Sequence, residues 1–294
     1  MITRILVLGL CLAGTASAQL NARLTVGYQP LSEAFDNDGD RDSIDRPVQE
    51  TLVPVNIAAD YTFFAGLYAG AELSLLYRDF PNYEVGGVEK DRGAFGISEL
   101  DLKVGWGGSF VVDVGIEAGF KFDLGKHPGD LEEDKVTTSD NNHAFHIGGN
   151  VGFSVLPMLS LGARINLVLP LEREVRNAAD IEEDRQSGTV VDAAATVGGS
   201  VGLGGVSLLY GVDLAFFYQG ALRVNGDVAG QINGEDPTIN MFHVIPMVGV
   251  GFGKHRVKLT LGAFGEDAML GIPLFGKNIS FATVPVSVTY GFAM

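Results

Sequence analysis

The stretch that most constrains the fold is residues 109–123, SFVVDVGIEAGFKFD, in which apolar and polar side chains alternate. Successive side chains of a β-strand point to opposite faces, so this period of two predicts a strand between an apolar and a polar medium. The stretch is about three times as long as an average soluble strand of roughly five or six residues. A tilted strand that crosses a bilayer needs about 9–11 residues, which this stretch supplies. The apolar face comprises Phe110, Val112, Val114, Ile116, Ala118, Phe120 and Phe122, and the polar face Ser109, Asp113, Gly115, Glu117, Gly119, Lys121 and Asp123.

The same alternation recurs along the chain and predicts twelve strands, at 20–28, 51–62, 66–78, 93–106, 109–123, 143–156, 159–170, 188–202, 205–219, 239–253, 256–267 and 280–292. Only helices and closed barrels satisfy every backbone hydrogen bond within lipid. After residue 18 no apolar run approaches the length of a membrane helix. The sequence therefore predicts an all-β fold, a single transmembrane antiparallel up-and-down β-barrel of about 12 strands.

Residues 1–18 have the three parts of a secretory signal peptide. Arg4 supplies the positive region, residues 5–13 the apolar region, and Ala16-Ser17-Ala18 the small-residue cleavage site. We expect cleavage before Gln19, so that the barrel occupies residues 19–294; a retained helical anchor is the alternative. Cys11, the only cysteine, lies in this segment, so the mature chain is expected to have no thiol.

The connections between the predicted strands fall into two lengths that alternate strictly. Five are tight, and the long ones are 29–50, 79–92, 124–142, 171–187, 220–238 and 268–279. The long connections hold 25 of the 36 acidic residues and 11 of the 20 basic ones. Short periplasmic turns and longer outer loops are typical of bacterial outer-membrane barrels. We therefore expect the outer membrane of a Gram-negative bacterium, with outer-membrane lipid and lipopolysaccharide as partners. The net charge of −16 argues against nucleic acid.

The two predicted faces of the barrel differ in charge. Outward positions of the strands at 66–78, 159–170 and 205–219 carry no charged residue, as a lipid-facing surface requires. Glycines on the inward face leave room for long side chains in the lumen. The predicted lumen-lining residues are Arg23, Asp60, Glu72, Glu99, Asp101, Lys103, Asp113, Glu117, Lys121, Arg164, Asp192, Asp213, Arg256 and Lys258.

A tight turn at Gly107-Gly108 would set the pairing of the fourth and fifth strands. It predicts that Lys103 lies near Asp113 and that Glu99 lies near Glu117. Two adjacent carboxylates need a compensating base, which Lys121 or Lys103 would provide.

Two interpretations of the interior stay open at this point. In the first, the charges line a narrow aqueous path, and the protein is a passive, porin-like channel for small solutes. In the second, the charges form a salt-bridge network that closes the lumen of a structural or surface-binding barrel. For the channel, the acidic outer loops predict a mild preference for cations at low salt.

Other chemistry has weak support in the sequence. Asp36, Asp38 and Asp40 in the first long connection are a candidate calcium site, but Arg41 and Pro47 stand where the calcium-loop pattern needs Gly and Glu; a solvated acidic loop is the alternative. His143 and His146 are three positions apart on a strand and so face opposite sides. We expect no metal, no cofactor and no catalytic residues, and hence no enzyme.

Two segments resemble known outer-membrane families. Gly96–Gly105, GISELDLKVG, and Gly119–Gly125, GFKFDLG, resemble consecutive strands of the transporter-like barrels associated with the phenol meta-degradation pathway, over about 95–170. Asp123-Leu124 stands where that family has Pro-Thr. The resemblance implies uptake of a small solute and assigns no binding residue. Tyr290-Gly291-Phe292 resembles the C-terminal signal read by the barrel-assembly machinery, although two further residues follow.

Overall fold

The computed structural model describes residues 19–29, 34–35, 41–42, 51–85, 88–109, 111–125, 142–156, 158–176, 181–229, 236, 238–262, 272–277 and 286–294. The predicted signal peptide, residues 1–18, lies outside these residues. So do Asp36, Asp38 and Asp40, the three residues of the candidate calcium site. Within the described part of the chain, no helix has the length and apolar character that crossing a membrane requires.

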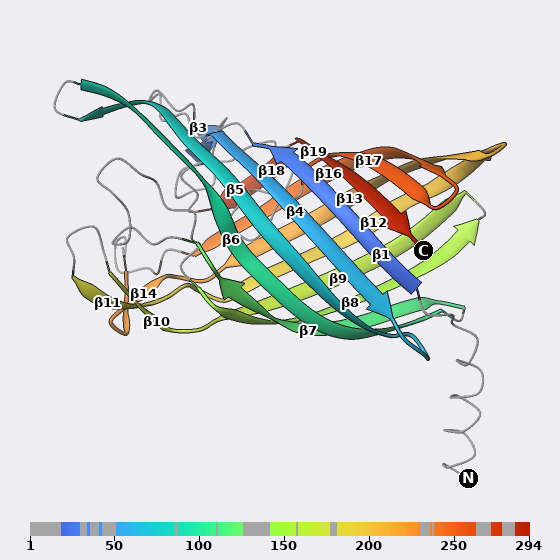
Figure 1. Cartoon of the computed structure of the whole chain (residues 1–294), viewed down its shortest axis with the longest axis horizontal. Coiled ribbons are helices and arrows are strands. Elements are labelled where there is room, and N and C mark those ends of the chain that lie inside the picture. Colours follow the sequence, from blue (N-terminus) through green and yellow to red (C-terminus); the bar gives the residue numbers. More distant parts are fainter. Residues whose placement is uncertain are drawn as a thin grey trace, which may run out of the picture.

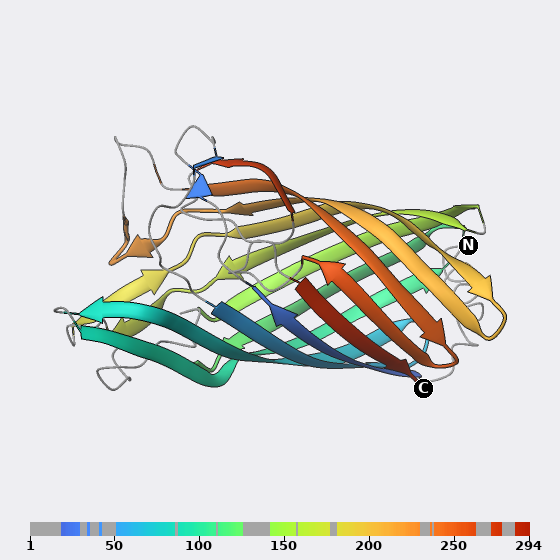
Figure 2. The same cartoon turned by 90° about the horizontal axis from the view of Figure 1, so that it is seen from above.

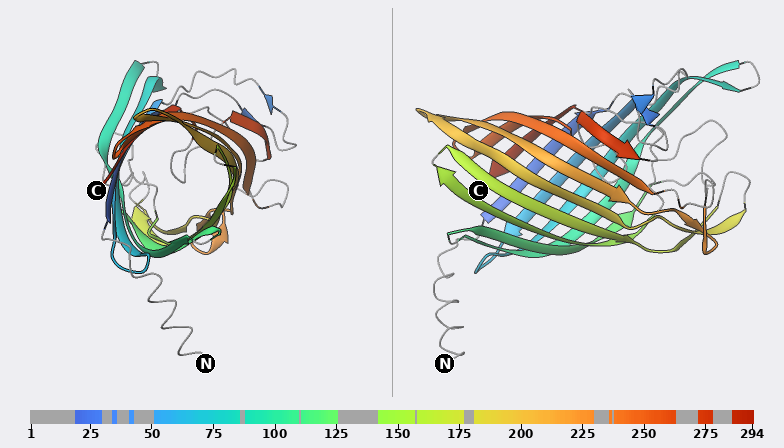
Figure 3. Two further views of the ribbon diagram at one scale, coloured as in Figure 1. Left: turned by 90° about the vertical axis from the view of Figure 1, so that its right-hand side faces the viewer. Right: turned by 180° about the vertical axis from the view of Figure 1, so that it is seen from behind.

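Twelve antiparallel strands form a closed ring, which confirms the predicted barrel (Figures 1 and 3). The ring closes where the first strand pairs with the last, with Asn21 opposite Ala293. In chain order the ring strands are β1 (Gln19–Tyr28), β4 (Thr51–Thr62), β5 (Leu67–Val85), β6 (Val88–Ser109), β7 (Asp113–Asp123), β8 (Ala144–Leu156), β9 (Leu159–Pro170), β12 (Val190–Leu203), β13 (Val206–Gln219), β16 (Ile239–Phe252), β17 (His255–Leu261) and β19 (Val286–Ala293).

The two ends of the barrel differ in the length of their connections (Figures 1 and 2). The tight turns lie at the end where β1 begins and β19 ends, and the long connections lie at the other. The hairpin of β5 and β6 extends beyond the barrel at the long-connection end (Figure 1). Because short and long connections alternate along the chain, all the short ones lie at one end of the barrel and all the long ones at the other.

The long connections contain short strands that the alternation pattern did not predict. β10 (Arg173–Arg176), β11 (Glu182–Gln186), β14 (Arg223–Val224) and β15 (Asp227–Val228) form a small sheet, and β2 (Ala34–Phe35) pairs with β3 (Arg41–Asp42). β18 (Ile272–Lys277) pairs with the part of β16 beyond the β17 ladder. β17 ends just before Gly262, whose φ of 137° suits only glycine.

The predicted turn at Gly107-Gly108 is wrong. The ladder of β6 and β7 continues to Ser109 opposite Asp113, so the chain reverses only after Ser109. Gly107 stays in the sheet because its N–H donates to the carbonyl of Gly66 at 2.9 Å. Lys103 consequently lies opposite Gly119 rather than near Asp113, and Glu99 lies opposite Asp123 rather than Glu117.

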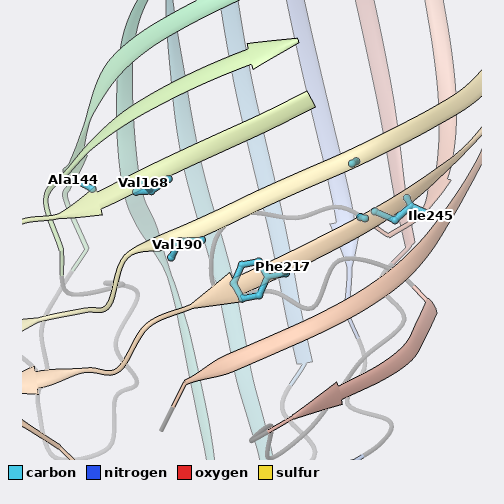
Figure 4. Close-up of a cluster of buried hydrophobic side chains, with 7 residues drawn as sticks. Ala144, Val168, Val190, Phe217 and Ile245 are labelled. Atoms are coloured by element: carbon cyan, nitrogen blue, oxygen red, sulfur yellow. The ribbon is translucent and has the colours of Figure 1, made fainter. Parts of the chain in front are cut away.

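The outer surface of the barrel is apolar and exposed, as a lipid-facing surface must be. Val104, Ile165 and Leu214, from three different strands, are each more than half exposed. A cluster of buried hydrophobic residues lies instead on inward-facing positions of neighbouring strands from β8 to β16 (Figure 4). We call them the inner apolar cluster: Ala144, Val168, Val190, Ala194, Ala215, Phe217 and Ile245.

Candidate functional site

The charges of the lumen are arranged around glycines of the barrel wall. Gly70 on β5 lies directly between Asp60 on β4 and Lys103 on β6 in the strand register. Asp60 Oδ1 and Lys103 Nζ approach to 3.8 Å across this glycine. A Cβ atom at Gly70 would lie 2.1 Å from Asp60 Oδ1. The glycine therefore lets an ion pair span an entire intervening strand while both side chains lie against the wall.

Lys103 also contacts the strand on its other side. Its Nζ lies 3.5 Å from Glu117 Oε2, and the Tyr68 hydroxyl donates to the same oxygen at 2.7 Å. The Tyr68 ring lies over Gly105, where a Cβ would meet the ring at 2.4 Å. Glu117 thus contacts both the ammonium group of Lys103 and the hydroxyl group of Tyr68, which lie on neighbouring strands of the wall.

Arg23 on β1 continues the network toward the barrel seam. Its guanidinium lies 3.7 Å from Asp60 and 3.8 Å from Glu72. With 47% of its side chain exposed, Arg23 keeps part of its charge toward the lumen.

A second row of polar contacts includes one hydrogen bond across β7 and one ion pair. Asp101 Oδ1 and His146 Nε2 are 2.8 Å apart, with Gly119 between their strands. Lys121 on β7 lies 3.6 Å from Glu99 on β6. The bases named from the sequence for Glu99 and Glu117 are therefore the ones that compensate them, Lys121 for Glu99 and Lys103 for Glu117.

A third group lies on β9, β12 and β13. Arg164 Nη1 donates to Asp192 Oδ2 at 2.5 Å, and Arg164 Nη2 lies 4.0 Å from Asp213 Oδ2. The other oxygen of each aspartate, Oδ1, is buried and has no hydrogen-bond partner among the described atoms. One arginine is thus shared by two carboxylates.

These lumen ion pairs run along the wall and not across the lumen. Each one joins strands that are adjacent in the ring or separated by a single strand. Among the described residues, no ion pair links opposite walls. The charges therefore line the interior without bridging it.

Another buried ion pair anchors the long-connection end. Arg173 on β10 donates to Asp123 Oδ2 at 2.5 Å, and the Asp123 side chain is 0% exposed. The N–H of Gly125 donates to the other oxygen at 3.0 Å. This pair attaches the small sheet of β10, β11, β14 and β15 to the barrel.

Two cavities follow one another inside the barrel. The central cavity, of about 490 Å³, is lined by every ring strand except β6 and β8. Its walls hold Arg23, Lys121, Arg164 and Lys258 beside Glu72, Asp192 and Asp213, with Val168, Val190, Phe217 and Ile245 of the inner apolar cluster. The lower cavity, of about 440 Å³, lies toward the tight turns and is lined by Ser154, Ser160, Ser200, Ser207 and Arg256 among glycines and leucines.

The structure places the predicted lumen residues in different surroundings. Seven line the central cavity, and Asp60, Glu99, Asp101, Lys103 and Glu117 contact them directly or lie beside them in the same rows of ion pairs. Arg256 lines the lower cavity, and Asp113 is exposed at the start of β7.

Sequence reasoning missed two contributors, Tyr68 and Arg173. Tyr68 occupies an inward position opposite Gly105, so alternation combined with the correct register would have identified it. Arg173 belongs to a long connection, for which alternation gives no placement.

His143 and His146 face opposite sides of the barrel wall, as their spacing predicts. His146 faces the lumen and contacts Asp101, whereas the His143 ring lies against Phe120 and Phe122 on the outer side. Within the described ranges, no three His, Cys, Asp or Glu side chains are grouped closely enough to hold a metal ion.

Comparison with known proteins identifies the fold. No family model and no curated protein matches the chain in sequence. The structure is similar to the COG4313 outer membrane channel from Pseudomonas putida F1, with a TM-score of 0.72 and 11% identity over 96% of this chain and 97% of that one. Lower similarity is found to the Pseudomonas putida toluene transporter TodX (TM-score 0.42, 11% identity, 97% and 91% covered) and to the NanC porin (TM-score 0.41, 8% identity, 92% and 98% covered).

The first of these similarities covers nearly the whole of both chains and shows a shared fold. The prediction of a closed antiparallel β-barrel, the fold of this outer membrane channel, is thereby confirmed. The narrower likeness of residues 95–170 to the phenol meta-degradation barrels stays a resemblance, because no family model matches.

Proposed function

We propose that this outer-membrane barrel is a passive channel for small solutes. One observation carries the proposal: in the part of the chain that the structure describes, the ion pairs of the lumen run along the wall, over glycines such as Gly70, and none bridges the interior. A lumen closed by salt bridges would instead need pairs between opposite strands. The central and lower cavities supply successive polar compartments along the barrel.

The two ends suggest an orientation in the membrane. We infer that the tight turns face the periplasm and that the long acidic connections face outward, where they raise the local concentration of cations. The apolar outer surface would contact outer-membrane lipid, and the acidic connections would meet lipopolysaccharide. The C-terminal strand β19 would be read by the barrel-assembly machinery.

The COG4313 outer membrane channel, which shares this fold over nearly the whole chain, supports this proposal. That protein is described as an outer membrane channel. The porin and the transporter carry no weight at their lower similarity. None of the three is described as an enzyme.

Liposome swelling tests the proposal. Vesicles with the folded protein are diluted into isotonic solutions of uncharged sugars of increasing size. We expect swelling with the smallest solutes and a steep decline as solute size increases. Vesicles that stay tight to every solute, with protein shown to be folded by its heat-dependent gel mobility, would contradict the proposal.

A non-conducting barrel is the second candidate, and the inner apolar cluster favours it. Val168 and Ile245 are each 1% exposed although they occupy inward positions, and buried apolar side chains narrow a water path. This candidate predicts tight vesicles together with a loss of surface binding when connections 29–50 and 171–187 are shortened.

A further inference from the structure

One sector of the barrel wall has a charge pattern unlike the rest. Four adjacent ring strands, β16, β17, β19 and β1, contain three bases and no aspartate or glutamate. We call the bases the basic strip: Arg23, Arg256 and Lys258. Arg23 and Arg256 flank Gly291 in the register, the arrangement in which Asp60 and Lys103 flank Gly70. Here both flanking residues are cations. Arg23 is paired with Asp60 and Glu72 on its other side, whereas among the described residues no carboxylate lies within 4.0 Å of the charged group of Arg256 or Lys258, so these two cations are uncompensated at contact distance.

Lys258 brings that uncompensated charge into the central cavity. Among the described residues, no carboxylate lies within 4.0 Å of its ammonium group, although Asp213 is near enough to act on it electrostatically. Thr25 and Thr289, whose hydroxyls are 3.0 Å apart, line the cavity beside it. An ammonium flanked by a guanidinium and hydroxyl groups is a suitable partner for a carboxylate.

The opposite charge is in excess on another wall of the same cavity. Among the described residues, Arg164 is the one base within 4.0 Å of Asp192 and Asp213, so these three side chains have a formal charge of −1, which Lys258 offsets only from a longer distance. Asp213 is 8% exposed, and its Oδ1, like the Oδ1 of Asp192, lacks a hydrogen-bond partner. Because an unsatisfied buried acceptor is costly, an incoming donor with a positive charge would be stabilised here.

Apolar side chains complete the cavity. Val168, Phe217 and Ile245 of the inner apolar cluster line it, with Val168 and Phe217 on β9 and β13, the strands that carry the Arg164 group. A solute with one positive group, one negative group and a small apolar body would satisfy all three parts. The volume of about 490 Å³ exceeds what such a molecule needs.

We propose that the central cavity binds zwitterionic α-amino acids with apolar side chains. The carboxylate would contact Lys258 and Arg23, the ammonium would contact the carboxyl groups of Asp192 and Asp213, which line the cavity, and the side chain would pack on Phe217. This proposal rests on the proposed channel function and names its class of solute.

Calorimetric titration of the folded, detergent-solubilised protein separates the three contacts. Leucine is compared with 4-methylpentanoate, which lacks the ammonium, with 3-methylbutylamine, which lacks the carboxylate, and with glycine, which lacks the side chain. We expect leucine to bind about tenfold or more tightly than each of the others, since each lacks one contact and a hydrogen bond to a charged group is worth that much. Equal affinity for leucine and both singly charged analogues would overturn the proposal.

Two substitutions test which residue contacts each charged group of the amino acid. Lys258→Met should weaken leucine and 4-methylpentanoate and leave 3-methylbutylamine unchanged, whereas Asp213→Asn should weaken leucine and the amine and leave the acid unchanged. Lys254→Met, in the tight turn outside both cavities, removes the same charge as Lys258→Met and should change none of them. Uniform effects of Lys258→Met and Asp213→Asn on all probes would contradict the assignment.

Binding and permeation distinguish this proposal from the channel function on which it rests. Vesicles that pass sugars while leucine gives no heat would overturn the amino-acid site alone. Leucine binding to a protein that leaves vesicles tight would support the site and overturn the channel.

Discussion

Asp60 on β4 and Lys103 on β6 form an ion pair across the strand that separates them, with 3.8 Å between Oδ1 and Nζ. Gly70 makes this possible because it has no side chain to stand between them. The pair shows how a lumen rich in charge can stay unbridged, since both of these charges are satisfied by a neighbour on the same wall.

Gly70→Ala should break that pair. The new Cβ would lie 2.1 Å from Asp60 Oδ1 and 3.2 Å from Lys103 Cε, so the carboxylate must move away. Overpacking of this kind costs about 1–3 kcal/mol, measurable by urea unfolding in lipid vesicles. Gly202→Ala is the control, because a Cβ there has no neighbour within 4 Å. Equal stability of the two variants would show that Gly70 does not serve the ion pair.

The cost of placing a charged residue on the outer face should depend on the depth of that residue in the membrane. Leu214, near the middle of β13, is 57% exposed, and an arginine at mid-membrane costs about 2–4 kcal/mol. Leu203, beside the tight turn, is 63% exposed and should tolerate arginine at about 0–1 kcal/mol. Reversible folding of Leu214→Arg and Leu203→Arg into vesicles measures both costs. A smaller cost at Leu214 would place the membrane at a different height on the barrel.

Arg173→Gln should loosen the small sheet at the long-connection end. The substitution leaves the fully buried Asp123 carboxylate without its cation, which costs about 3–5 kcal/mol. We expect faster proteolysis within 171–189 while the barrel stays folded. Arg223→Gln, an exposed residue of the same sheet, should change proteolysis little. Identical digestion of the two variants would mean that Arg173 does not anchor the sheet.

Phe292→Ala tests the proposed reading of the last strand by the assembly machinery. Phe292 lies opposite Ala22 and His255 in the ladders that close the barrel. If the residue is read during assembly, the variant accumulates less folded protein in cells but refolds in vitro at a nearly unchanged yield. A matching loss in both settings would assign Phe292 to barrel stability instead.

The alternation of side chains was sufficient to predict the ring, its twelve strands and the inward faces. It was not sufficient to predict the pairing of β6 with β7, because Gly107 and Gly108 suit a turn and a strand equally. As a result, Lys103 was predicted to lie near Asp113, whereas in the structure it lies opposite Gly119. Asp113 and Gly119 both face inward. A change of pairing register by an even number of residues keeps every side chain on the same face, so the alternation pattern cannot distinguish the two registers.

The contacts that depend on distant segments could not be predicted. Arg173 and Asp123 are 50 positions apart and meet only because the β10 segment folds back over the barrel end. The grouping of bases on β16, β17, β19 and β1 likewise requires the ring to close, since Arg23 is more than 230 positions from Lys258 in the chain.

Single-channel recording of the wild-type protein in a planar bilayer tests the central claim most directly. A lumen whose ion pairs lie along the wall predicts discrete, stable current steps in symmetric KCl, without any added ligand. A bilayer that stays silent with protein proven to be folded and inserted would contradict the account and would assign the charges to a closed barrel.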